Sequence, residues 1–233
     1  PVASKTALAF FAFALCASAG YILNDLLDLD EDRRHKTKKN RALASGRVTI
    51  GAGFLLAILC LTAGASIARF LPTAFAIALT AYIAISVSYS VFLKRLLVVD
   101  VLALAVLYTL RVVAGGFATG IVLSPWLLSF AFFLFLSLAF AKRAADLVQH
   151  QQDNQRILPG RGYLTTDLDA VSIAGMCGGF LSALVLTLYI NSESVQLLYR
   201  RPGLLWGLQP ILLYYFSRLW VICRRGKLTE DPT

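Results

Sequence analysis

The chain has 233 residues, of which 58% are hydrophobic and 15% are charged, and its mean hydropathy is +0.70. Soluble globular domains contain about 45–50% apolar residues, so this composition excludes a soluble domain and favours a helical membrane protein. The net charge of +9 does not indicate nucleic-acid binding, because the basic residues cluster in short loops between apolar segments, as is usual in membrane proteins.

Apolar segments long enough to cross a bilayer recur along the whole chain. A transmembrane helix needs about 20 mainly apolar residues. The segments that meet this requirement, with Pro72 separating the second from the third in a tight hairpin, are 5–27, 50–69, 71–92, 97–119, 123–147, 168–190 and 203–223. We therefore predict an all-α integral membrane helical bundle with seven transmembrane helices, forming a single domain over residues 1–233.

Small residues indicate where these helices pack closely. Gly115, Gly116 and Gly120 lie in the fourth predicted span, and Gly175, Gly178 and Gly179 lie in the sixth. Patterns of this kind allow helix backbones to approach one another in membranes, so we expect both sets at helix interfaces.

The distribution of positive charge predicts the orientation in the membrane. Most Lys and Arg residues fall in 28–49, 93–99, 142–167 and the tail after Cys223, which a seven-span topology places on one side. Cytoplasmic loops carry an excess of these residues. We expect the protein in the inner or cytoplasmic membrane, with these loops on the cytoplasmic side.

An acidic segment follows the first predicted span. Asp25, Asp28 and Asp32 are three and seven positions apart and fall on one helix face, with Asn24 at its edge. Carboxylate and amide oxygens suit Mg²⁺, which usually completes its shell with water and substrate phosphates. The sequence predicts a catalytic metal–diphosphate site at the bilayer surface, with a solvated charged helix end as the alternative.

Residues 24–46 resemble the first Asp-rich motif of the UbiA superfamily of intramembrane prenyltransferases. The matching positions are Asn24-Asp25-x-x-Asp28-x-x-x-Asp32, Lys38, Arg41 and Ser45-Gly46. Two prolines of the family pattern are absent, since Lys36 follows His35 and Ala42 follows Arg41. The resemblance implies Mg²⁺ held by the Asn and three Asp residues, and Lys38 and Arg41 on the diphosphate. It also implies nine helices, so one is expected to be missing at each end of this chain.

Two further stretches bear on substrate binding. Tyr89-Ser90-x-x-x-Lys94 resembles the loop of this family that contacts the diphosphate, although a lysine at a helix end can equally anchor the helix at the membrane interface. Arg111 lies inside the fourth predicted span, where a guanidinium is costly and requires a partner. An anionic substrate, an acid of the Asp25 motif or Asp100 would each serve.

The third of these predicted loops, 142–167, indicates a branch of the superfamily. Its residues Lys142-Arg143-x-x-Asp146, followed by Arg161-x-Tyr163, resemble the polyprenyl-phosphate phosphoribosyltransferases, which usually have Glu at the position of Asp146. Members with aromatic acceptors generally carry a second Asp-x-x-x-Asp motif, which this loop lacks. The resemblance implies that these residues bind substrate, whereas the alternative is that the bases only orient the protein in the membrane.

Two anionic substrates need more cations and fewer carboxylates than one diphosphate and a neutral ring. This charge balance agrees with the resemblance, which implies Mg²⁺-dependent transfer of 5-phosphoribose from phosphoribosyl diphosphate to a polyprenyl phosphate. One alternative is prenyl transfer from a polyprenyl diphosphate to an aromatic or other small acceptor. The other is a non-catalytic protein that binds or transports an anionic lipid, which offers no account of the acidic face.

Overall fold

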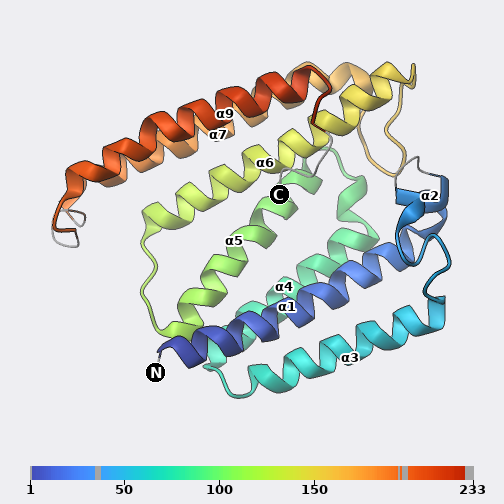
Figure 1. The fold of residues 1–233 in the computed structure, drawn as a ribbon, viewed down its shortest axis with the longest axis horizontal. Coiled ribbons are helices and arrows are strands. Elements are labelled where there is room, and N and C mark those ends of the chain that lie inside the picture. The colour runs from blue at the N-terminus through green and yellow to red at the C-terminus, as the bar shows by residue number, and fades with distance from the viewer. Residues whose placement is uncertain (1, 35–37, 194, 196–198, 229–233) are drawn as a thin grey trace. The chain divides into compact units, whose positions relative to one another are not determined.

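The structure is a computed structural model that describes residues 2–34, 38–193, 195 and 199–228, and it consists mainly of helices (Figure 1). The α-helices are α1 (Val2–Leu27), α2 (Leu29–Arg34), α3 (Ile50–Ala68), α4 (Thr73–Val91), α5 (Val99–Thr119), α6 (Pro125–Gln152), α7 (Leu168–Ile190) and α9 (Leu208–Arg224). The short 3₁₀ helices are η1 (Lys38–Asn40), η2 (Leu93–Arg95), η3 (Thr165–Asp167) and η4 (Pro202–Gly207).

The helices confirm the predicted all-α membrane bundle. Within the described residues, six helices are long and apolar enough to cross a membrane, namely α1, α3, α4, α5, α6 and the helical segment Thr165–Ile190. The seventh predicted span, 203–223, is different: η4 occupies its first residues, so α9 starts only at Leu208 and has 17 residues. Pro72 caps the start of α4, as the predicted hairpin requires.

The chain divides into two compact units. The first comprises Pro1–Lys94 and Leu110–Val122, and the second comprises Arg95–Thr109 and Leu123–Thr233. The first half of α5 therefore belongs to the second unit, and the second half belongs to the first.

The first unit is built on α1, which packs against α3 and α4 (Figure 1). The approach of α1 and α3 depends on Gly64, because a Cβ atom there would lie 2.6 Å from Cys16 Sγ and 2.8 Å from the carbonyl oxygen of Ala12. Ala114 and Ala118 of α5 are buried in the same core. Small side chains thus allow these membrane helices to make close contact.

The second unit is built on α6, α7 and α9, which run side by side in Figure 1. A Cβ atom on Gly175 would lie 2.2 Å from the ring of Trp220, and one on Gly179 would lie 2.7 Å from Phe216. Ser137 donates a hydrogen bond of 2.7 Å to the carbonyl oxygen of Gly175. These contacts confirm the predicted packing role of the glycines in α7.

The corresponding prediction for α5 is wrong at two positions. A Cβ atom on Gly115 or Gly120 would meet no atom within 4 Å. Gly120 instead follows the last residue of α5 with a φ of +74°. This left-handed conformation favours glycine and ends the helix.

Candidate metal and substrate site

The acidic motif lies where α1 passes into α2. Helical hydrogen bonds continue across the junction, from the Asp28 amide to the Asn24 carbonyl (2.9 Å) and from the Asp32 amide to the Asp28 carbonyl (2.8 Å). The 3.6-residue period is therefore kept, which places Asp25, Asp28 and Asp32 on one helix face as the sequence predicted.

Arg41 bridges two carboxylates of this face. Its Nη1 atom lies 2.8 Å from Asp25 Oδ1 and 2.9 Å from Asp32 Oδ2. Asp32 is buried, whereas the Arg41 side chain is 41% exposed. A guanidinium that is partly solvated can exchange partners more readily than a buried one, because water stabilises its charge during the exchange.

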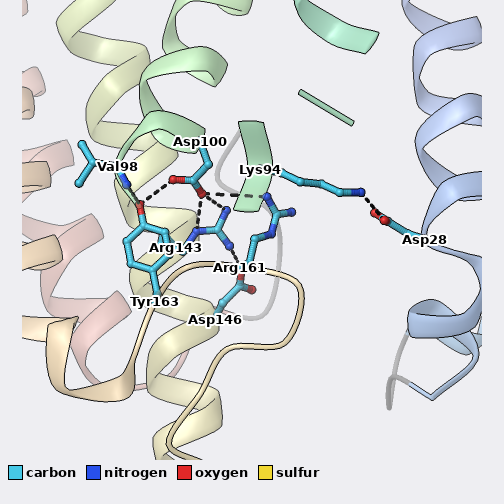
Figure 2. Close-up of polar contacts among 8 residues, drawn as sticks. All are labelled: Asp28, Lys94, Val98, Asp100, Arg143, Asp146, Arg161 and Tyr163. Atoms are coloured by element: carbon cyan, nitrogen blue, oxygen red, sulfur yellow. Dashed lines mark hydrogen bonds and ion pairs between the residues drawn. The ribbon is translucent and has the colours of Figure 1, made fainter. Parts of the chain in front are cut away.

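Lys94 neutralises the third carboxylate. It is only 4% exposed, and its Nζ atom forms an ion pair with Asp28, toward which it extends in Figure 2. This contact joins η2 to the acidic motif across 66 residues of sequence. Of the two roles left open for Lys94, membrane anchoring does not explain a buried ammonium group on a carboxylate.

The donor atoms of this face fit Mg²⁺ in their chemistry. The side-chain oxygen of Asn24 is buried and has no hydrogen-bond partner, which costs about 1–3 kcal/mol and makes it available to a cation. Within the described residues, however, no group of three or more Asp, Glu, His or Cys side chains is gathered around a point that could hold a metal ion. Arg41 and Lys94 neutralise the three carboxylates instead. The predicted metal ligands stay a prediction.

Arg111 contacts two tyrosines, Tyr21 and Tyr82. Its Nη2 atom donates to the Tyr21 hydroxyl at 3.1 Å and to the Tyr82 hydroxyl at 3.2 Å, and its guanidinium carbon lies 5.7 Å from the centre of the Tyr82 ring. The expected alternative partner, Asp100, bonds to other residues. Sequence reasoning missed both tyrosines, because their relation to Arg111 arises only from the packing of α1, α4 and α5.

A second polar cluster belongs to the second unit and centres on Asp100, at the start of α5 (Figure 2). Asp100 is completely buried and accepts hydrogen bonds from Arg143 Nε (3.0 Å) and from the Tyr163 hydroxyl (2.6 Å). Arg143 also lies 2.8 Å from Asp146, and Arg161 lies 4.0 Å from Asp100. Four residues that the third loop predicted as substrate contacts therefore gather around an acid that the sequence analysis considered only as a partner for Arg111.

Tyr163 links this cluster to the backbone at Val98. Its hydroxyl also accepts a hydrogen bond of 3.0 Å from the amide of Val98, a β-branched residue with a φ of +65°, which is an unfavourable conformation for such a side chain. Burial and the hydrogen bond to Asp100 raise the pKa of Tyr163 well above the usual value of a phenol. Gly162 allows its backbone to approach Arg95 closely, since a Cβ atom on Gly162 would lie 2.7 Å from the carbonyl oxygen of Arg95.

The three remaining predicted substrate residues come from three different helices. Lys38 is exposed at the start of η1, while Tyr89 in α4 and Lys142 in α6 are half-buried. Each makes polar or electrostatic contacts within the protein. Residues 35–37, where one of the family prolines is replaced, lie outside the described residues.

Comparison with known proteins agrees with this fold. The family model "UbiA prenyltransferase family" matches residues 1–222, so the chain belongs to the UbiA prenyltransferase family. The decaprenyl-phosphate phosphoribosyltransferase of Corynebacterium glutamicum is 36% identical over 153 residues, which are 65% of this chain and 46% of that protein.

A second relative is the uncharacterized protein y4nM of Sinorhizobium fredii, which is 37% identical over 98% of this chain and 44% of its own length. The chain thus spans less than half the length of both curated relatives. A UbiA homologue from Archaeoglobus fulgidus, solved with DMAPP and Mg²⁺, has a TM-score of 0.74 at 18% identity and covers 94% of this chain and 75% of its own. This similarity confirms the fold.

Proposed function

We propose that the protein transfers 5-phosphoribose from phosphoribosyl diphosphate to a polyprenyl phosphate, with Mg²⁺, at the cytoplasmic side of the membrane. The observation that carries this proposal is the set of three acids on one face of α1 and α2, each already paired with a cation. Such a set can bind a metal and a diphosphate together, because the acids take the metal while the released cations take phosphate oxygens.

The choice of substrates rests on the third loop and the relatives. Aromatic-acceptor enzymes of the family use a second acidic motif there. In this chain Asp146 lies in α6 and bonds to Arg143, and Asp167 in η3 accepts a hydrogen bond from the amide of Leu164. Acids held in this way do not favour a second metal. The 36% identity with a decaprenyl-phosphate phosphoribosyltransferase supports the same choice.

The reaction needs little from acid–base groups. An oxygen of the ionised lipid phosphate attacks C1 of the ribose, the bond from C1 to the diphosphate oxygen breaks, and its electron pair leaves with the diphosphate. The nucleophile already carries negative charge, so no general base is required. The chain's task is to orient the two anions and to stabilise the charge of the leaving group.

The residues divide this task. Asn24, Asp25, Asp28 and Asp32 would hold Mg²⁺, which supplies positive charge to the departing diphosphate when bound. Arg41 and Lys94, which pair with these acids, would turn to the phosphate oxygens once the metal is in place. Lys38 in η1 would add further positive charge.

Prenyl transfer is the second candidate, because the homologue from Archaeoglobus fulgidus was solved with a prenyl diphosphate, DMAPP. A donor and acceptor panel separates the two reactions. The full chain in nanodiscs receives Mg²⁺ and either ribose-labelled phosphoribosyl diphosphate with a polyprenyl phosphate, or labelled farnesyl diphosphate with 4-hydroxybenzoate.

We expect the ribose label to enter the lipid phase and to be lost with EDTA. Label transfer from farnesyl diphosphate alone would replace this proposal with prenyl transfer. No transfer from either donor would contradict both. Asp30→Asn is a suitable control variant throughout, because Asp30 is an exposed acid in α2 that points away from the motif face.

A further inference from the structure

Helix α9, in the second unit, carries an open groove on its surface. The groove has a volume of about 490 Å³ and is lined by Tyr214, Ser217, Arg218, Val221, Ile222 and Arg225. Two of these six residues are arginines. Asp and Glu side chains are absent from the lining, as far as the described part of the chain extends. The groove is therefore a positively charged site.

The packing of α9 leaves this groove accessible. Phe216 and Trp220 are buried, and they contact the glycines of α7 described above. Tyr214, Arg218 and Arg225 are exposed. The helix thus buries one face in the core of the second unit and presents the groove on the other.

Apolar side chains surround the groove along α9. Ile211, Leu213, Tyr215 and Val221 are between 41% and 62% exposed. Exposed apolar surface of this extent marks contact with a membrane or a partner, and in a bundle of membrane helices it is stable against lipid acyl chains. Arg225 is the C-cap of α9, so the groove begins where the helix ends and runs back along this apolar surface.

The two arginines can reach one anion from the two ends of the groove. They are seven positions apart, which places them on one face and about 10 Å apart along the helix axis. Their long side chains can extend along that face. Arg218 Nη1 donates to the Tyr214 hydroxyl at 2.9 Å, and its guanidinium carbon lies 5.9 Å from the centre of the Tyr214 ring. The tyrosine therefore orients the Arg218 guanidinium at the groove.

We propose that this groove binds an anionic phospholipid, whose phosphate lies between the guanidinium groups of Arg218 and Arg225 and whose acyl chains lie along the exposed apolar surface of α9. Planar N–H groups of arginine suit phosphate, because they can donate to two of its oxygens at once. The sequence predicts that the tail after Cys223 is cytoplasmic, and anionic lipids give that membrane surface a negative potential. This inference does not depend on the proposed reaction.

Charge complementarity favours a lipid over a second copy of this chain. A symmetric contact through the groove would bring the same surface of both copies together, and with it Arg218 and Arg225 of each. Like charges placed opposite one another disfavour association. An anionic phospholipid instead offers a negative group for the arginines and apolar chains for the residues beside them.

Native mass spectrometry of the full chain tests the proposal directly. The protein is released from detergent micelles that contain equal amounts of phosphatidylglycerol and phosphatidylcholine with the same acyl chains. We expect the wild type to retain phosphatidylglycerol preferentially. Arg225→Gln should lower this preference about tenfold, the size of one charge-assisted hydrogen bond, and Arg218→Gln/Arg225→Gln should lower it further. Equal retention of both lipids by the wild type, or an unchanged preference in the double variant, would overturn the proposal.

Arg224→Gln is the matched control. It removes the same charge from the neighbouring position, but Arg224 is not part of the groove lining and its Nη2 atom lies 2.9 Å from Asp169 Oδ1. We expect the preference for phosphatidylglycerol to stay nearly unchanged. A loss as large as that of Arg225→Gln would mean that the overall charge of the helix end attracts the lipid, and would contradict a site in the groove.

Ser217→Glu covers the case in which the arginine variants do not fold. Ser217 is exposed and lines the groove, so this variant keeps both arginines and places a carboxylate among them. The carboxylate should compete with the phosphate for the two guanidinium groups and abolish the preference for phosphatidylglycerol. An unchanged preference in Ser217→Glu would show that the phosphate does not bind in the groove.

Farnesyl phosphate distinguishes a phospholipid from a phosphorylated isoprenoid in the same groove. A phospholipid has two acyl chains to place against the apolar residues of α9, whereas farnesyl phosphate has one chain. With equal amounts of both present, we expect the wild type to retain phosphatidylglycerol. Retention of farnesyl phosphate instead, lost in Arg225→Gln, would assign the groove to a lipid substrate and overturn the proposal.

Discussion

The two polar clusters of this protein use the same chemical groups in opposite ways. In the first unit, Asp25 and Asp32 share an arginine whose side chain is 41% exposed. In the second unit, Asp100 and Arg143 form an ion pair in which both side chains are at most 2% exposed. Burial separates Arg143 from Arg41, because an arginine paired without water can hold a structure together but does not readily exchange its partner for a ligand.

The two polar clusters therefore differ in function. The carboxylates of α1 and α2, two of which share the partly exposed Arg41, are suited to take a metal and release their cations. The buried cluster fixes the third loop to the start of α5 through Tyr163 and Arg143, and it has little freedom to bind anything else. Variants of the first cluster should therefore change activity, and variants of the second should change stability.

The largest expected effect is on Asp28. Asp28→Asn removes a charge from the proposed metal site, and loss of one charge-stabilising group at a reaction centre typically lowers kcat about 100- to 1,000-fold. The fold should persist, since asparagine keeps the size of the side chain and its amide oxygen can still accept a hydrogen bond from the buried Lys94. The labelled transfer assay measures the rate, with Asp30→Asn as the control. Turnover by Asp28→Asn at the wild-type rate would remove Asp28 from the site.

For Arg143 we expect a loss of stability instead of a direct loss of activity. Arg143→Met leaves the charge of Asp100 buried without its main partner, and breaking such a pair costs about 3–5 kcal/mol. The thermal unfolding midpoint in detergent measures this loss. Adding Asp100→Asn to the same chain should restore part of it, because the unpaired charge is then gone.

Asp169→Asn provides the matched control for Arg143. It breaks the pair of Asp169 with Arg224, whose side chains are 80% and 43% exposed, and such surface pairs contribute only about 0–1 kcal/mol. If Arg143→Met unfolds at the same temperature as Asp169→Asn, the buried pair of Arg143 contributes no more to stability than a surface pair, which would contradict this account.

An intermediate effect is expected for Arg41. Arg41→Gln removes the cation shared by Asp25 and Asp32, so it should raise the KM for phosphoribosyl diphosphate about tenfold, the size of one charge-assisted hydrogen bond. The unfolding midpoint should hardly move, since Arg41 is partly exposed. A large loss of stability with an unchanged KM would show that Arg41 stabilises the fold and does not bind the diphosphate.

How much of the structure could be predicted from the sequence depends on how far apart along the chain the interacting residues are. The face shared by Asp25, Asp28 and Asp32 depends only on helical periodicity and was predicted. The pairing of Lys94 with Asp28 and the role of Asp100 depend on contacts between residues 43 to 66 positions apart, which periodicity cannot supply. The seventh span was predicted too long because hydropathy does not register the 3₁₀ turn of η4.

The smallest expected effect on activity is that of Tyr163→Phe. This variant loses the hydrogen bonds to Asp100 and from Val98, at a cost of about 1 kcal/mol each, and should leave the KM values unchanged. The raised pKa of Tyr163 gives a second readout. Its stabilisation is complete below the unfolded-state value of about 10 and is lost as pH rises from there toward the higher folded-state value.

Unfolding midpoints recorded from pH 8 to 11 measure the Tyr163 contribution. The wild type should lose stability above pH 10 more steeply than Tyr163→Phe, which has no phenol to ionise at this position. Identical alkaline slopes for the two proteins would contradict the proposed link between the buried hydroxyl and Asp100.

The most direct test of the account is whether the acidic face of the first unit binds a metal together with a diphosphate. Electron paramagnetic resonance can follow Mn²⁺, which accepts the same oxygen ligands as Mg²⁺, in the full chain with and without inorganic diphosphate. We expect a bound Mn²⁺ signal that appears with diphosphate, persists in Asp30→Asn and is lost in Asp28→Asn. The same bound signal in Asp28→Asn, or no bound metal in the wild type, would contradict the central claim.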